Sequence, residues 1–326
     1  MPSIFTVASK EFSDIVRGKR FIILVAVFGL VMTAAVATTY LIGTQSAARP
    51  GQVGLAQGFL GAAGRNLVTM MGYFAPIMGL ALGVDAISGE KEKGTLKITL
   101  AQPVFRDTLI NGKFLAAFFA ISLATLIASL VEVGGSVLAL GITPTGEDVA
   151  RLMLFLLFSI LFAMTYYGIA TFLSTVSRRT THSVIVGVVI WAVFAFVIGV
   201  VASVVASALV PISFPGFRAG NATAGLSPTE LQTLRTEEAA RAAITASINS
   251  VTPNYHFSRI AEYILNITLY TRFGTFPGAG QTPTVTTTVT IMQSLASAWP
   301  NMLVLVLATV LVFIASYMVF TRQEVR

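Results

Sequence analysis

Six apolar stretches, each about 20 residues long, dominate this chain of 326 residues. A helix of about 20 residues crosses the roughly 30 Å of hydrocarbon in a bilayer. Hydrophobic residues make up 55% of the chain, against roughly 45–50% in soluble domains. We therefore predict an all-α integral membrane protein whose six transmembrane helices lie at 21–43, 67–87, 114–140, 152–174, 183–210 and 302–320.

The charged residues indicate membrane topology rather than nucleic-acid binding. The formal net charge is +7, but Lys and Arg flank the apolar stretches instead of forming a basic stripe. With the N-terminus inside, the basic groups around Lys19, Lys93 and Arg178 fall on the cytoplasmic side, as the positive-inside rule requires. The first apolar stretch is longer than the roughly 7–15 residues of a signal-peptide core, so we expect it to be retained. We thus predict a multi-pass protein of the cytoplasmic membrane with both termini in the cytoplasm.

Two segments outside the spans have helical patterns. Residues 3–18 place apolar side chains such as Ile4 and Phe12 at three- and four-residue spacing, which predicts an amphipathic helix in the membrane interface. A solvated cap to the first span is the alternative. The connection 211–301 predicts helices over 228–249 and 256–270 in an extracytoplasmic insertion. Its two glycosylation sequons, at Asn221 and Asn266, are as consistent with chance as with use.

The domain organisation follows from these segments. We predict a transmembrane domain over 1–210 with a cytoplasmic loop at 88–113, an extracytoplasmic loop domain over 211–301, and a sixth span with a cytoplasmic C-terminus over 302–326. No internal repeat is visible.

The chain lacks the sequence motifs of several kinds of catalytic and metal-binding site. No Gly-x-x-x-x-Gly-Lys-Ser/Thr phosphate loop occurs, so the chain does not hydrolyse ATP alone. It has no cysteine and only two histidines, His182 and His256, which lie far apart in the sequence. It also lacks the Gly-x-Ser-x-Gly motif of hydrolases. We therefore expect no catalytic, cofactor or metal site in this chain.

The densest group of charges, over 85–113, separates the second and third spans and must lie in water. It contains a distinctive set of residues: Asp85, Ile87, Ser88, Gly89, Glu90, Lys91, Glu92, Gly94, Thr95, Leu96, Gln102, Pro103, Val104, Arg106 and Lys113. With these residues the sequence resembles the ABC type 2 permease family, the six-span membrane subunits of ATP-driven exporters, and within it permeases of the copper-site-maturation and sodium or multidrug efflux kind. The resemblance covers most of the chain, including Lys10-Glu11-Phe12 and the ending Tyr317…Phe320-x-Arg322, but not the long loop.

That resemblance implies partners that the chain itself lacks. It implies two cytoplasmic ATP-binding cassette subunits, which hold ATP and Mg, and a second permease copy or paralogue. It also implies membrane lipids as neighbours and no nucleic acid. Export is expected rather than import, with the substrate unspecified.

The same loop suits an element that couples the ATPase to the spans. A short helix over 95–101, fixed by Gly94 and Pro103, could dock in a cleft of the ATPase, while the charges around it make rim contacts. The alternative is that these charges only end the spans in water. The predicted coupling residues are Glu90, Lys91, Glu92, Gly94, Thr95, Leu96, Pro103 and Arg106.

Two acidic residues lie in or near the predicted spans. Glu132, inside the third span or near its outer end, is costly in hydrocarbon and needs a partner, a proton or water. It belongs either to a substrate or proton path or to a structural position. The structural position is a helix-to-helix hydrogen bond, or the end of the span with Gly134-Gly135 breaking the helix just beyond. Asp85 is expected to anchor the coupling loop. Glycines of the second and fifth spans, such as Gly79 and Gly83, permit close helix contact and hence a dimer interface, and the aromatic residues of the fourth span are expected to pack.

Two other functions stay open at this point. An ion-gradient-driven secondary transporter would need buried ionisable residues and broken helices in matched halves, and Glu132 is the one well-buried candidate. A non-transporting subunit that uses the ATPase to act mechanically on an envelope partner is the other.

Overall fold

The computed structural model describes residues 3–47, 60–96, 105–141, 143–211, 228–267 and 289–323. Every regular element in these ranges is a helix. Six stretches are long and apolar enough to cross a membrane, which confirms the predicted fold class: Lys19–Leu41, Arg65–Glu92, Arg106–Ala139, Gly146–Val176, Thr180–Leu209 and Ile291–Arg322.

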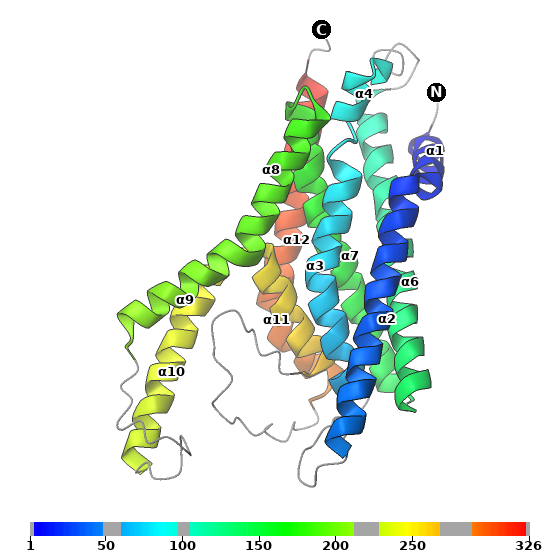
Figure 1. Cartoon of the computed structure of the whole chain (residues 1–326). Coiled ribbons are helices and arrows are strands. Elements are labelled where there is room, and N and C mark those ends of the chain that lie inside the picture. The colour runs from blue at the N-terminus through cyan, green and yellow to red at the C-terminus, as the bar shows by residue number, and fades with distance from the viewer. Residues whose placement is uncertain are drawn as a thin grey trace.

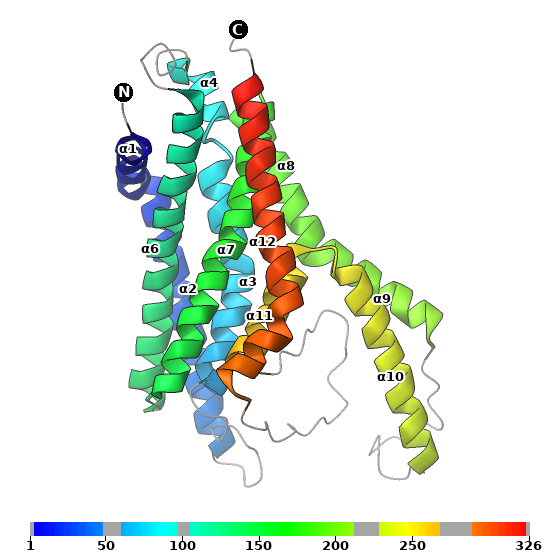
Figure 2. The same cartoon turned by 180° about the vertical axis from the view of Figure 1, so that it is seen from behind.

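The long helix α7 (Gly146–Val176) lies at the centre of the bundle, between α3 (Arg65–Gly83) and α12 (Ile291–Arg322) (Figures 1 and 2). The helices α2 (Lys19–Ala47) and α6 (Arg106–Leu140) complete it. The aromatic residues of the fourth span fill its interior, as expected, because Phe155, Phe162, Tyr166 and Tyr167 are all buried.

Close approach of α3 to α7 depends on two glycines. A Cβ atom on Gly83 would lie 2.6 Å from Cβ of Ala170 and 2.8 Å from the carbonyl oxygen of Tyr167. A Cβ on Gly79 would clash with the carbonyl oxygen of Ala163. These glycines were expected at a dimer interface, but their space is occupied by a helix of the same chain, so they serve packing within the bundle.

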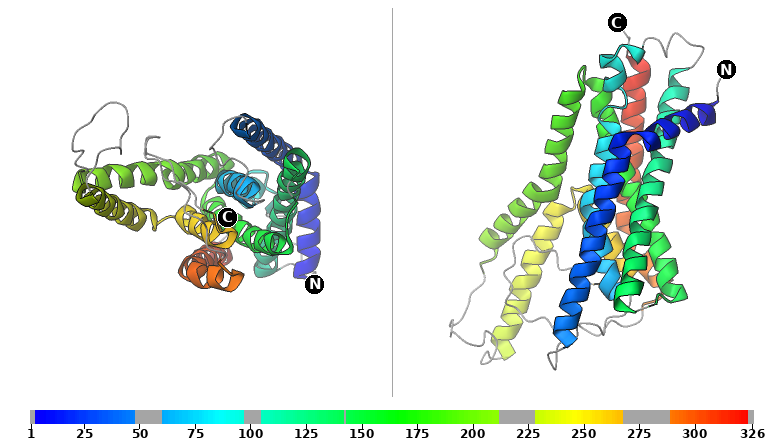
Figure 3. Two further views of the ribbon diagram at one scale, coloured as in Figure 1. Left: turned by 90° about the horizontal axis from the view of Figure 1, so that it is seen from below. Right: turned by 45° about the vertical axis from the view of Figure 1, so that its right-hand side comes forward.

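The fifth span leaves the bundle part-way along its length. It consists of α8 (Thr180–Ala192), a π-helical turn (Val193–Val197) and α9 (Ile198–Leu209). Figure 3 shows α9 and α10 (Pro228–Asn249) running side by side, away from the other spans. The π turn widens the helix locally. It could not be predicted from the sequence, because every residue in the turn is hydrophobic, like the rest of the span.

Capping residues set the other helix ends. Pro253 follows the Thr252 N-cap, and Asn266 ends α11 (Pro253–Leu265) in the left-handed conformation, so the helix predicted over 256–270 starts and ends earlier. A capping box of Thr290 and Gln293 starts α12 at Ile291, before the predicted start of the sixth span at 302. α11 packs against α12, α7 and α3 within the bundle, and its position relative to the membrane stays a prediction.

One end of the bundle carries the elements that concern function. Figure 1 shows α1 (Ile4–Arg17), the short helix α4 (Ser88–Glu92) and the last turn of α12 at this end, here named the α4 end. The other is named the opposite end. α1 is capped by Ser3, which confirms a helix in this segment, and it crosses α6 at Gly112, where a Cβ atom would lie 2.6 Å from Val7.

Candidate functional site at the α4 end

A buried lysine joins three elements at the α4 end. Lys113 of α6 is 5% exposed, and its Nζ lies 2.8 Å from Oε2 of Glu11 in α1 and 2.6 Å from Oε1 of Glu90 in α4. Each partner carries one charge, so this triad of Lys113, Glu11 and Glu90 has a net charge of −1. Removing one member of a buried ion pair typically costs about 3–5 kcal/mol, because the remaining charge is left uncompensated. The triad therefore fixes α1 and α4 to α6.

The two carboxylates of the triad differ in their surroundings. Burial of Glu11 disfavours its charged form, but the ammonium groups of Lys113 and Lys10 outweigh this and lower the pKa of Glu11 below its ordinary value. Glu90 binds Lys113 through one oxygen only, and its buried Oε2 has no hydrogen-bond partner within the described ranges. Glu90 thus faces the bundle rather than the surface.

A pair of serines attaches the start of α4 to α7. The hydroxyl of Ser174 accepts hydrogen bonds from the backbone N–H groups of Ile87, at 3.0 Å, and Ser88, at 2.8 Å. It also lies 3.0 Å from the hydroxyl of Ser88, which is completely buried. These bonds satisfy backbone donors at the junction of α3 and α4 and attach the start of α4 to α7.

The end of α4 reaches α12 and α8. Lys91 donates to Oε1 of Gln323, at 2.9 Å, and to the carbonyl oxygen of Thr175. Gln323, which follows α12, also accepts from Arg106 through its carbonyl oxygen. Glu92 accepts from the backbone N–H of Thr180, the first residue of α8, at 3.2 Å.

Asp85 lies in the segment that leads into α4, and its expected role as an anchor of the coupling loop stays a prediction. It forms an ion pair with Arg20 at the start of α2, so the segment that leads into α4 is also attached to the first span. The triad, the serine pair, the Asp85 ion pair and the contacts of Lys91 and Glu92 join α4 and its flanking segment to α1, α2, α6, α7, α8 and the residue that ends α12. The segment itself continues from α3, within the second span.

Side chains available to a partner lie just beyond these contacts. Glu92, Lys93, Gly94 and Thr95 are exposed, and we name these residues the α4 tip. Gly94 has a φ of +71°, which reverses the chain direction after α4 and favours glycine, and a Cβ atom there would meet open space. Leu96 is buried at the base of the turn.

The predicted coupling residues therefore divide into two groups. Glu90, Lys91 and Arg106 are partly buried in contacts within the chain, whereas Glu92, Gly94 and Thr95 belong to the exposed tip. Two tip residues also bond within the chain, Glu92 to Thr180 and Thr95 to the carbonyl oxygen of Glu90. Pro103 and most of the helix expected over 95–101 lie outside the described residues, as does Asn221. The role of all these residues toward an ATPase stays a prediction.

Glu132 lies at the opposite end, away from the triad. Its Oε1 accepts a hydrogen bond from Asn66 of α3 at 3.1 Å, which is a bond between helices. The helix break expected at Gly134-Gly135 is wrong, because α6 continues to Leu140. Asn266 forms the left-handed cap of α11, and its glycosylation stays a prediction.

Sequence reasoning missed the most extensively bonded residue at the opposite end. Arg151 of α7, 3% exposed, pairs with Glu147 and donates to the carbonyl oxygen of Ile264 at 2.7 Å and the hydroxyl of Ser294 at 3.0 Å. It thereby joins α7 to α11 and α12. A signal was present, because an Arg inside an apolar run with Glu four residues earlier requires buried partners.

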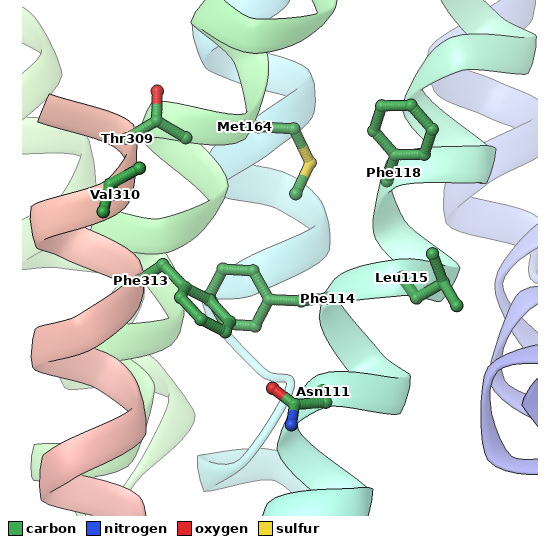
Figure 4. Close-up of a pocket in the computed structure, with 8 residues that line it drawn as sticks. All are labelled: Asn111, Phe114, Leu115, Phe118, Met164, Thr309, Val310 and Phe313. Atoms are coloured by element: carbon green, nitrogen blue, oxygen red, sulfur yellow. The ribbon is translucent and has the colours of Figure 1, made fainter. Parts of the chain in front are cut away.

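An apolar hollow lies between α6, α7 and α12 (Figure 4). The rings of Phe114 and Phe313 meet edge to face at 4.6 Å within it. It offers no charged group, so it suits contact with hydrocarbon rather than chemistry. Its lining residues are Asn111, Phe114, Leu115, Phe118, Met164, Thr309, Val310 and Phe313.

Comparison with known proteins identifies the family. The model of the ABC-2 family transporter protein matches residues 5–325. A probable ABC transporter permease protein NosY of Pseudomonas aeruginosa is 35% identical over 127 residues, which cover 39% of this chain and only 43% of that relative. The protein of the same description from Stutzerimonas stutzeri is 27% identical over 205 residues, or 62% of this chain and 70% of that relative. The match over nearly the whole length shows that the chain belongs to the ABC-2 family of transporter proteins.

Proposed function

We propose that this chain is the membrane subunit of an ABC exporter and that the α4 tip is where its ATP-binding subunit docks. Membership of the ABC-2 family makes the chain a membrane permease subunit of an ABC transporter, in which ATP and Mg act on a separate ATP-binding partner. Export, docking at the tip and the identity of the substrate go beyond family membership. The observation that carries the docking proposal is the arrangement of α4, which continues from the second span and has an exposed tip above a base bonded to the other five spans.

The contacts of α4 give a physical route from the tip to the membrane. Movement of the tip reaches α6 through Glu90 and Lys113, α7 through Ser174, and α12 through Lys91 and Gln323. Because these contacts are buried or half-buried and bonded, α4 cannot shift without moving those helix ends. Glu90, Lys91 and Arg106 thus act by positioning α4, while the tip meets the ATPase.

We further propose that two permease chains, this one twice or with a paralogue, assemble with two ATP-binding subunits. The fifth span supports this, because only 6% of its most apolar window is buried within the chain, which leaves a long apolar face for a partner or lipid. The basic residues near α4 favour a cytoplasmic location for the α4 end and for both termini, in the cytoplasmic membrane. The α10–α11 region then lies toward the outside.

Two glycines at opposite ends of the bundle provide a matched test of docking. Gly94 and Gly141 both have positive φ, at 71° and 67°, both are exposed, and neither would bring a new Cβ atom into contact. Gly94→Arg and Gly141→Arg therefore impose similar backbone strain, of about 1–2 kcal/mol. We expect the tagged Gly94→Arg chain to lose the ATPase on gentle extraction while Gly141→Arg retains it.

The outcome is measured by mass spectrometry of the extracted complex and by its ATPase activity. Equal recovery of the ATPase with both variants would show that the α4 tip is not the docking surface. Equal loss with both would attribute the effect to strain and contradict the proposal as well.

A further inference from the structure

Three helices meet at a polar cluster near the opposite end. Asn66 of α3 points its Nδ2 at Oγ1 of Thr39, 2.8 Å away, and at the carbonyl oxygen of Ala35, 3.3 Å away, both in α2. The same nitrogen lies 3.1 Å from Oε1 of Glu132 in α6. An amide nitrogen carries two hydrogens, so three acceptors already exceed what Asn66 can donate. Glu132 receives at most one bond from it.

Glu132 is sealed inside the protein. Its exposed fraction is 0%, and its Oε2 has no hydrogen-bond partner within the described ranges. Close contact of α2 and α6 closes the site, because a Cβ atom on Gly135 would lie 3.1 Å from the side chain of Val36. In this conformation the carboxyl group therefore has no contact with surface water.

No charge compensates Glu132. Among the described residues it forms no ion pair, and Arg65, next to Asn66, does not pair with it. The π-helical turn Leu60–Gly64 carries no titratable group. On α7, Glu147, Asp148 and Arg151 are engaged with each other, with the Thr145 cap and with α11 and α12. The other titratable groups of α2 and α3 on this side are Tyr40 and Tyr73. On α11, which packs against α3, Arg259 and Glu262 pair with each other.

A carboxylate in this environment would be a buried charge that receives hydrogen bonds only from the neutral side chains of Asn66 and Ser136. Such a charge costs several kcal/mol, and a buried carboxyl group normally takes up a proton instead. We propose that Glu132 is a proton-binding site, with the proton on Oε2, and that the neutral carboxyl group holds the ends of α2, α3 and α6 together. The proposal rests on this geometry and is independent of where the ATPase docks.

The position of Glu132 indicates which side supplies the proton. Lys113 and Glu132 are 19 residues apart on α6 (132 − 113), roughly 28 Å at 1.5 Å per residue, which is about the thickness of the hydrocarbon core. Glu132 thus lies near the boundary opposite the α4 end, and exchanges its proton with that compartment. Loss of the proton leaves an uncompensated charge, which only water or a cation entering between α2 and α6 can relieve. The site therefore links the packing of α2 to the acidity of that compartment.

Infrared spectroscopy of the full chain, assembled with its ATP-binding subunit in lipid nanodiscs, tests the proton directly. At neutral pH the wild-type minus Glu132→Gln difference spectrum should contain the C=O stretching band of one protonated carboxyl group, which shifts in heavy water. Asp14→Asn, which removes an exposed carboxyl group paired with Lys10, should remove no such band. If Glu132→Gln removes only carboxylate bands, the group is ionised and the proposal is wrong.

A second variant covers the case in which Glu132→Gln fails to fold. Asn66→Val keeps Glu132 and the bond from Ser136 but removes the amide donor of α3, so the protonated band should remain and move to higher frequency. Absence of a protonated carboxyl band from both wild type and Asn66→Val would overturn the proposal. Where Glu132→Gln does fold, it mimics the neutral acid, so raising the pH should lower the unfolding midpoint of wild type more than that of Glu132→Gln. Identical pH profiles would count against the proton site.

Discussion

The Lys113→Met variant tests the triad most severely. Met has a similar length and stays apolar, so the change removes the ammonium group without opening a large cavity. Glu11 and Glu90 then lose the ammonium group that lies 2.8 Å from Glu11 and 2.6 Å from Glu90 in the wild type. Because Lys113 is only 5% exposed, solvent does not replace it, and we expect a loss of about 3–5 kcal/mol in unfolding free energy.

A matched lysine in the same cluster provides the control. Lys10 also contacts Glu11, at 3.1 Å, but its side chain is 70% exposed. Exposed ion pairs contribute about 0–1 kcal/mol, so Lys10→Met should cost no more than that. The triple variant Lys113→Met, Glu11→Gln, Glu90→Gln removes all three charges and should recover most of the loss.

Unfolding of the purified protein in detergent, followed by circular dichroism across a denaturant series, measures these differences. A Lys113→Met cost below about 1 kcal/mol, or one equal to that of Lys10→Met, would refute the reasoning from burial. Failure of the triple variant to recover stability would show that charge imbalance is not the cause.

Three further predictions concern helix contacts and pH, with unfolding measured in the same way. Gly83→Ala should destabilise the protein by about 1–3 kcal/mol, because the new Cβ would lie 2.6 Å from Cβ of Ala170. Gly134→Ala, in open space on α6, should stabilise the protein by about 0.5–1 kcal/mol. Equal effects of the two substitutions would contradict the packing account. Arg151→Leu should cost about 3–5 kcal/mol by leaving buried acceptors on α11 and α12 unpaired, and Arg65→Leu, with no ion pair among the described residues, about 0.5 kcal/mol or less. Lys113 lowers the pKa of Glu11 from its ordinary 4.5. The stabilisation by Glu11 is therefore fully present above pH 4.5 and is lost as the pH falls below it. Glu11→Gln should make the unfolding free energy less sensitive to acid, and an unchanged acid profile would show that Glu11 does not titrate as described.

The six spans could be predicted from the sequence because the length of an apolar run is a local property. The helix over 228–249 could be predicted as well, since Pro228 and Glu230 mark its start, and the structure has α10 at Pro228–Asn249. The shifted ends of α11 and α12 resulted from caps at Thr252 and Thr290 that were not used in the prediction.

The contacts of the candidate site were less accessible to sequence reasoning. The loop that contains α4 could be recognised from its charges, but Glu11 and Lys113 are separated by 102 residues, and no local pattern brings them together. Glu90 and Lys91 look like solvated charges in the sequence, yet they bond to helices far along the chain. Similarly, the space that Gly79 and Gly83 provide could be predicted, but not that α7 of the same chain fills it.

Site-specific cross-linking at the α4 tip tests the central claim most directly. The chain has no cysteine, so Lys93→Cys introduces a single thiol on the exposed tip, and Val149→Cys a matched one on the exposed surface of α7 at the opposite end. Each variant is labelled with a photoactivated cross-linker in native membranes, and its adducts are identified by mass spectrometry. We expect the ATP-binding subunit to be captured from Lys93→Cys and not from Val149→Cys. Capture from neither position, or from Val149→Cys alone, would contradict docking at the α4 tip.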